Sequence, residues 1–163
     1  MVAGRLARAG WGVRWVEADE MSRSRPYGMI SELLGAEAVY PPLPDTAGRL
    51  IEAAERPCDD GPVLLCADDL HPADGDSLDL LGWFVDMIKD LPLSLVASRR
   101  PLPVRDGLAV LATRPDVYLV QLGGLAPEDL DALVTARCGA PPGPEVQELL
   151  AVTGGNPFHE NDA

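Results

Sequence analysis

The chain has 163 residues, a length that predicts one domain with a sizeable core. Hydrophobic residues make up 47% and charged residues 24%, which excludes a wholly disordered chain. The net charge of -13 disfavours direct nucleic-acid binding by this segment, because such binding depends on Lys and Arg contacts with phosphates. There is no run of about 18 apolar residues and no secretory signal, so we expect a cytoplasmic chain without membrane contact.

Three residue types limit the possible chemistry. Lys89 is the single lysine among 13 basic residues, and its place near the end of an amphipathic pattern suggests a solvated charge. The cysteines Cys58, Cys66 and Cys138 have no CxxC spacing, and the two histidines complete no zinc quartet. We therefore predict buried, reduced thiols in place of a metal or redox site.

The first part of the chain alternates short helices with one strand. Its predicted elements are a helix end at Leu6–Ala9 capped by Gly10, a strand partly buried on both faces at Gly12–Ala18, a helix at Pro26–Leu34 stopped by Gly35, and a helix from Asp45 or Thr46 to about Arg56. The prolines of PPLP at Pro41–Pro44 predict a rigid connector before the last of these helices.

Apolar runs dominate the middle of the chain. Val63–Ala67 (VLLCA) predicts a strand buried on both faces of a parallel sheet, and Leu93–Ala97 (LSLVA) a second buried strand. Between them, Asp76 is the expected cap of a helix of about 14 residues that Pro92 ends. The core side of this helix should carry five apolar residues, namely Leu78, Leu81, Phe84, Val85 and Ile88.

The remaining predicted elements are a helix at Val104–Ala112, a third apolar strand at Val117–Leu122, and helices at Pro127–Arg137 and Glu145–Thr153, the last stopped by Gly154 and Gly155. Apolar strands that alternate with helices predict an α/β protein with a parallel sheet. Ligands of such a sheet bind beyond the carboxyl ends of its strands.

Two adjacent carboxylates, Asp68 and Asp69, follow the first buried strand at this edge of the predicted sheet. One carboxylate suits Mg²⁺, usually through water, while its neighbour can orient or deprotonate an attacking water. A pair of aspartates at a strand end is equally typical of a turn or helix cap, so the pair by itself leaves both interpretations open.

The wider sequence around the pair resembles a known family. Val63–Leu81 (VLLCADDLHPADGDSLDLL) is similar to the Walker B region of the ATPase domain in large LuxR-type transcriptional regulators, which belong to the AAA+/STAND group of P-loop NTPases. In that family the strand ends in DDLHWAD. Here Leu70, His71 and Asp74 match, while Pro72 stands where the family usually has Trp.

Three more segments resemble the same family, in the same order along the chain. Leu93–Pro101 (LSLVASRRP) is similar to its sensor strand, with Ser98 and Arg100 at the matching positions. The two others are PYGMISELLG at Pro26–Gly35, and the lid-like pair LGGLAPEDLDAL at Leu122–Leu133 with TGGNPF at Thr153–Phe158. The resemblance implies a partial AAA-like core over residues 1–125 and the start of a helical lid over residues 126–163.

The family's Walker A loop, G-x-x-x-x-G-K-[ST], does not occur in this sequence. We expect the chain to begin just after that loop and to lack the strand that precedes it. In the family that strand lies between the sensor strand and the last strand. Without it, we expect the sensor strand and the last strand to expose unpaired backbone groups.

The resemblance implies ATP and Mg²⁺ as ligands of the parent family. Asp68 would be the Mg²⁺ carboxylate through water, Asp69 the water-positioning residue, and Ser98 with Arg100 the sensors of the γ-phosphate. We expect a fragment of a regulator's ATP-binding domain that does not hydrolyse ATP alone. Either it binds ATP and Mg²⁺ as the parent family does, or it needs no cofactor. The alternative is a non-catalytic interaction module that pairs its exposed sheet edges with itself or another protein.

Other interpretations of single features are simpler. A phosphoacceptor receiver domain also places aspartates at a strand end, but it needs a lysine on its last strand that Val117–Leu122 does not supply. His71 is expected to form loop hydrogen bonds because no nucleophile motif accompanies it. The three tryptophans are expected to pack in the core or at an edge, namely Trp11, Trp15 and Trp83.

Overall fold

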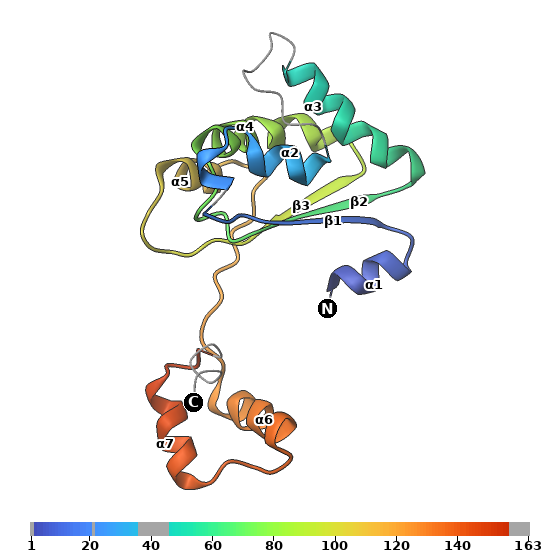
Figure 1. Cartoon of the computed structure of the whole chain (residues 1–163). Coiled ribbons are helices and arrows are strands. Elements are labelled where there is room, and N and C mark those ends of the chain that lie inside the picture. The colour runs from blue at the N-terminus through green and yellow to red at the C-terminus, as the bar shows by residue number, and fades with distance from the viewer. Residues whose placement is uncertain (1, 21, 36–45, 157–163) are drawn as a thin grey trace. The chain divides into compact units, whose positions relative to one another are not determined.

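The computed structural model describes residues 2–20, 22–35 and 46–156 (Figure 1). The chain divides into two compact units, Met1–Tyr118 and Leu119–Ala163. The predicted connector Pro41–Pro44 and the candidate cap Asp45 lie outside the described residues, as does Phe158 of the TGGNPF segment.

The first unit is an α/β structure built on three parallel strands. The strands are β1 (Gly12–Glu17), β2 (Val63–Asp68) and β3 (Leu93–Ala97), in the spatial order β1-β2-β3. Its α-helices are α1 (Val2–Arg8), α2 (Gly28–Leu34), α3 (Thr46–Glu55), α4 (Gly75–Met87) and α5 (Asp106–Ala112). Short 3₁₀ turns are η1 (Ser22–Ser24), η2 (Arg56–Asp60) and η3 (Ile88–Asp90). The predicted α/β class with a parallel sheet is confirmed.

Helices α2, α3 and α4 lie over one face of this sheet, whereas α1 lies on the other side against β1 (Figure 1). Side chains alternate between the two faces along each strand. On the helix-covered face, Val16 of β1 and Leu65 of β2 belong to the main core. On the opposite face, the register aligns Trp15, Cys66 and Val96 in one row. We call this second side of the sheet the open face.

The main core forms where the helices contact the covered face. The five residues predicted for the core side of α4 are all buried, and they are Leu78, Leu81, Phe84, Val85 and Ile88. Helix α2 adds Ile30, Leu33 and Leu34, and it ends as predicted at Gly35, whose φ of 64° favours glycine. The helical period of apolar residues therefore predicted the buried side of both helices correctly.

The cap of α4 is Asp74, and the prediction of Asp76 was wrong. The buried Asp74 side chain accepts a hydrogen bond from the backbone N–H of Ser77 at 2.8 Å and from its Oγ at 2.6 Å. The same carboxylate accepts bonds from the amides of Tyr27 at 2.9 Å and Met29 at 3.5 Å at the start of α2. Asp74 therefore joins the beginnings of two helices, which the local cap pattern did not show.

Two predictions about strands also need correction. Strand β3 is not buried, because no described strand pairs with its second edge and Val96 on the open face is 59% exposed. Val117–Leu122 forms no strand, and Tyr118 is 91% exposed. A strand needs a neighbour for its backbone groups, and no described strand pairs with this segment, so the apolar sequence forms no strand.

The second unit contains α6 (Pro127–Cys138) and α7 (Pro144–Val152), close to the predicted bounds. Leu130 and Leu150 are its buried apolar residues in the part that the structure describes. Gly154 and Gly155 have φ values of 62° and 80°, in agreement with the predicted helix stop. Their backbone also closes the unit, because the amide of Leu125 donates to the carbonyl of Gly155 at 2.8 Å.

The side chain of Lys89 is 45% exposed, in agreement with the predicted solvated charge, and it also forms two ion pairs. Its Nζ lies 3.3 Å from Asp86 and 3.1 Å from Asp116, and these hydrogen bonds, first that of Asp116, raise the pKa of the lysine. Asp86 also accepts a short hydrogen bond from Arg114, which is the main reason that its own pKa is lowered. The single lysine therefore ties residue 116 to the end of α4.

The remaining cysteine and tryptophan predictions hold only in part. All three cysteines are free thiols, but Cys66 is buried, Cys58 is half-buried and Cys138 is exposed. Burial raises the pKa of both Cys58 and Cys66. Trp15 on edge strand β1 and Trp83 on α4 are each more than half exposed, so neither belongs to the buried core.

Candidate functional site

The carboxyl ends of β2 and β3 lie side by side. Asp68 is the last residue of β2, and Ser98 directly follows β3. The backbone ladder continues past both strands, because the amide of Ser98 donates to Ala67 at 3.0 Å and the amide of Leu70 donates to Ser98 at 2.9 Å. This pairing fixes the loop after β2 to the loop after β3.

All four predicted site residues meet at this edge. The Ser98 hydroxyl donates a short hydrogen bond to Oδ1 of Asp68 and accepts one from the Asp69 amide at 2.9 Å. The Asp69 amide also lies 3.1 Å from Oδ1 of Asp68. Arg100 forms an ion pair with Asp69, with 2.6 Å between Nη2 and Oδ2. The structure therefore joins Asp68, Asp69, Ser98 and Arg100 into one cluster.

Asp69 has an unusual backbone and an unsatisfied side-chain atom. Its φ of 45° lies in the left-handed region, which Asp tolerates better than most residues other than Gly. Its Oδ1 is buried and has no hydrogen-bond partner among the described residues, although the side chain as a whole is 27% exposed. An unsatisfied carboxylate oxygen is costly, so a bound water or cation would stabilise this arrangement.

His71, in the same loop, gives a second unsatisfied atom. Its ring Nδ1 is buried without a hydrogen-bond partner among the described residues, whereas its backbone carbonyl accepts a bond from Arg105. The predicted loop hydrogen bonding is therefore made by the backbone of His71 and is not seen at ring Nδ1. Both unsatisfied atoms lie in the loop that carries the predicted site.

The donor set of the cluster suits a hard divalent cation. Two carboxylates and one guanidinium leave one net negative charge, and the available ligands are carboxylate and hydroxyl oxygens, which Mg²⁺ prefers. No group of three or more His, Cys, Asp or Glu side chains able to hold a metal occurs among the described residues. The cluster therefore fits an ion that retains several water ligands, because Mg²⁺ commonly uses only one or two protein carboxylates.

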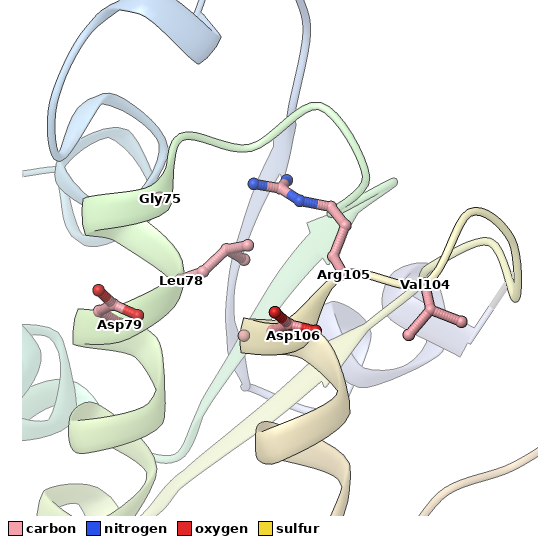
Figure 2. A pocket seen from close by; sticks show the side chains of 7 residues that line it. Gly75, Leu78, Asp79, Val104, Arg105 and Asp106 are labelled. Carbon is pink, nitrogen blue, oxygen red and sulfur yellow. The ribbon is translucent and has the colours of Figure 1, made fainter.

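A separate cleft of about 340 Å³ lies between the beginnings of α4 and α5. Figure 2 shows the residues around it, which are Gly75, Leu78, Asp79, Val104, Arg105, Asp106 and Gly107. None of the four predicted site residues lines this cleft, and both acidic side chains around it are exposed. The cleft is therefore separate from the carboxylate pair, although Arg105 at its edge also bonds the loop after Asp69.

We compared the chain with protein-family models, curated proteins and solved structures. No match was found. Within the part of the chain that the structure describes, every helix is too short or too polar to cross a membrane.

Sequence reasoning missed two residues that shape the site. Asp74 matched the family pattern, but nothing in its sequence context showed that it bonds the amides of α2. Arg105 carried no local signal, yet its Nη1 donates to three carbonyls of the loop after Asp69. Both contacts join residues more than 30 positions apart, which a local pattern cannot show.

Proposed function

We propose that this chain is part of the ATP-binding signalling domain of a LuxR-type transcriptional regulator, and that its AAA-like core retains the Mg²⁺ side of the nucleotide site. The observation that supports this most is the meeting of Asp68, Asp69, Ser98 and Arg100 at the carboxyl ends of two neighbouring parallel strands. These residue types match the Walker B and sensor positions by sequence, and the site lies where parallel sheets bind ligands.

Each residue then has a distinct role. Asp68 holds Mg²⁺ through water while Ser98 fixes its carboxylate. Asp69 orients a water molecule and is paired in this structure with Arg100. Ser98 and Arg100 respond to the γ-phosphate, so an incoming phosphate would compete with Asp69 for the Arg100 guanidinium.

These 163 residues alone are not expected to hydrolyse ATP. They contain no G-x-x-x-x-G-K-[ST] segment, whose backbone amides and lysine would hold the phosphates. The single lysine, Lys89, is engaged by Asp86 and Asp116. We therefore expect weak divalent-cation binding, with ATP contributing only through the bound metal.

Titration with Mn²⁺, followed by electron paramagnetic resonance, tests this site directly. Asp68→Asn should weaken Mn²⁺ binding by at least about 10-fold, because a ligand charge is lost. Arg100→Gln should strengthen it, because a cation that competes for Asp69 is removed. Asp79→Asn is the matched control, since it makes the same charge change at an exposed position of α4.

Equal effects of Asp68→Asn and Asp79→Asn would show that binding reflects only the acidic surface, and the proposed site would be wrong. An ATPase assay tests the second half of the proposal. Turnover by the purified chain that Asp69→Asn abolishes would contradict the claim that these residues do not hydrolyse ATP alone.

A non-catalytic interaction module derived from this domain is the second candidate function. The second edge of β3, with which no described strand pairs, and the exposed Tyr118–Leu122 segment favour it, because exposed edges and exposed apolar segments pair with other chains. Light scattering should then detect an oligomer that is indifferent to ATP and Mg²⁺ and that Val120→Asp dissociates. A monomer at all concentrations would exclude self-pairing.

A further inference from the structure

Arg105 contacts the loop after Asp69 in an unusual way. Its Nη1 donates to the carbonyls of Leu70 at 3.4 Å, His71 at 2.6 Å and Ala73 at 2.7 Å. Figure 2 shows its side chain extending from the start of α5 toward the loop that precedes Gly75. The Arg105 guanidinium therefore bonds three of the four carbonyls in the stretch 70–73, which forms no helix or strand.

The stretch 70–73 is fixed at three points. Its beginning is bonded to β3 through the Leu70 amide and the Ser98 carbonyl. Asp74 follows its end and is fixed to α2 by the amides of Tyr27 and Met29. Arg105 supplies the third point, in the middle of the stretch, through its guanidinium group.

We propose that Arg105 is a positioning residue for the divalent-cation site. By binding the carbonyls of residues 70–73, it keeps the preceding residue, Asp69, in its left-handed backbone conformation and directs its carboxylate to the cluster. Arg105 itself touches none of the four cluster side chains in the contacts described above. The inference rests on the proposed Mg²⁺ site and adds a residue that acts on it through the backbone.

Electrostatics alone predicts the opposite effect. Removing a positive charge near a cation site lowers the repulsion felt by the cation, so a purely electrostatic role for Arg105 would make Arg105→Gln bind Mn²⁺ more tightly. A positioning role makes the same variant bind more weakly. The sign of the change therefore separates the two explanations.

The experiment is a Mn²⁺ titration of the full chain, monitored by electron paramagnetic resonance. We expect Arg105→Gln to weaken binding about 10-fold, the lower end of the effect seen when residues that orient metal ligands are removed. The Mn²⁺ affinity of Arg105→Lys should lie between those of the wild type and Arg105→Gln, because lysine keeps the charge but has a compact ammonium in place of the planar guanidinium. Two charge-matched controls complete the set. Arg100→Gln should bind Mn²⁺ more tightly. Arg114→Gln should leave the Mn²⁺ affinity unchanged, because Arg114 is half-buried and paired with Asp86.

If the wild-type chain binds no Mn²⁺, the proposed function is wrong. The role of Arg105 in ordering the loop is then tested by a second measurement that needs no metal. The heteronuclear NOE of the Leu70 and His71 amides should fall in Arg105→Gln and stay unchanged in Arg114→Gln. Equal or tighter Mn²⁺ binding by Arg105→Gln, or an unchanged NOE in the loop, would overturn the positioning role. Thermal unfolding of each variant shows whether the fold has been kept.

Discussion

The two faces of the three-stranded sheet carry similar apolar side chains but are buried to very different extents. Leu65 on the helix-covered face is 1% exposed, whereas Val96 on the open face of the adjacent strand is 59% exposed. Both residues are typical of strands buried in parallel sheets. The difference shows that burial here is decided by which helices and strands are neighbours, and not by residue type.

The central strand sharpens this comparison. Strand β2 has a neighbour on each side, and even Leu64 and Cys66, which point toward the open face, are buried. Each edge strand has a described neighbour on one side only, and Trp15 and Val96, which lie in the same row as Cys66, are exposed. Burial on the open face therefore depends on whether a residue lies on the central strand or on an edge strand.

The largest expected effect is on the covered face. Leu65→Ala should lower the free energy of unfolding by about 3 kcal/mol, because it leaves a cavity in the main core. Val96→Ala on the open face should cost no more than about 0.5 kcal/mol, as is usual for exposed positions. Urea unfolding of both variants gives the two values. Equal losses would mean that the open face is covered in solution.

A smaller loss is expected at the connection between α2 and α4. Asp74→Ala should cost about 2 kcal/mol, because it removes a helix cap and leaves amide groups at the start of α2 without partners. Asp79→Ala, on an exposed position of the same helix, serves as the control and should change stability little. Urea unfolding again provides the measurement. A similar loss in both variants would refute the linking role of Asp74.

The smallest effect is expected at the solvent-exposed ion pairs of α4. The hydrogen bond from Arg114 lowers the pKa of Asp86, so its stabilising effect is present above the pKa of the unfolded carboxyl and is lost as pH falls through the lowered folded value. The pKa of Lys89 is raised, so its contribution is present at neutral pH and is lost as pH rises through that raised value.

Thermal unfolding from pH 2 to 7 tests the first of these effects, with Asp86→Asn as the variant. Asp86→Asn should lose slightly less stability than the wild type as the pH falls below about 4. Identical pH profiles would show that the pairs contribute nothing measurable, which is common for exposed ion pairs.

The sequence was informative wherever neighbouring residues decide the structure. The apolar run Val63–Ala67 predicted a buried strand, and the helical period of Leu78, Leu81 and Phe84 predicted the core side of α4. The family resemblance named both Asp68 and Ser98 as site residues, and the two side chains meet because the parallel strands β2 and β3 are neighbours and end at the same edge of the sheet.

Predictions failed wherever a distant partner decides the structure. Val117–Leu122 has the apolar pattern of a strand, but a strand also needs a bonding neighbour. The cap of α4 moved to Asp74 because that carboxylate also bonds the amides of α2. Arg105 was missed because its three acceptors are backbone carbonyls, which every residue has, so no residue type marks such a contact.

The paired side chains of Asp74 and Ser77 have a consequence for how the helices open. Four amide protons end on these two side chains, those of Tyr27, Met29, Ile30 and Ser77. Exchange of these protons with solvent requires the same carboxylate and hydroxyl to move away. The beginnings of α2 and α4 should therefore fray together, with one shared opening free energy, although Gly28 and Asp74 are 46 positions apart in sequence.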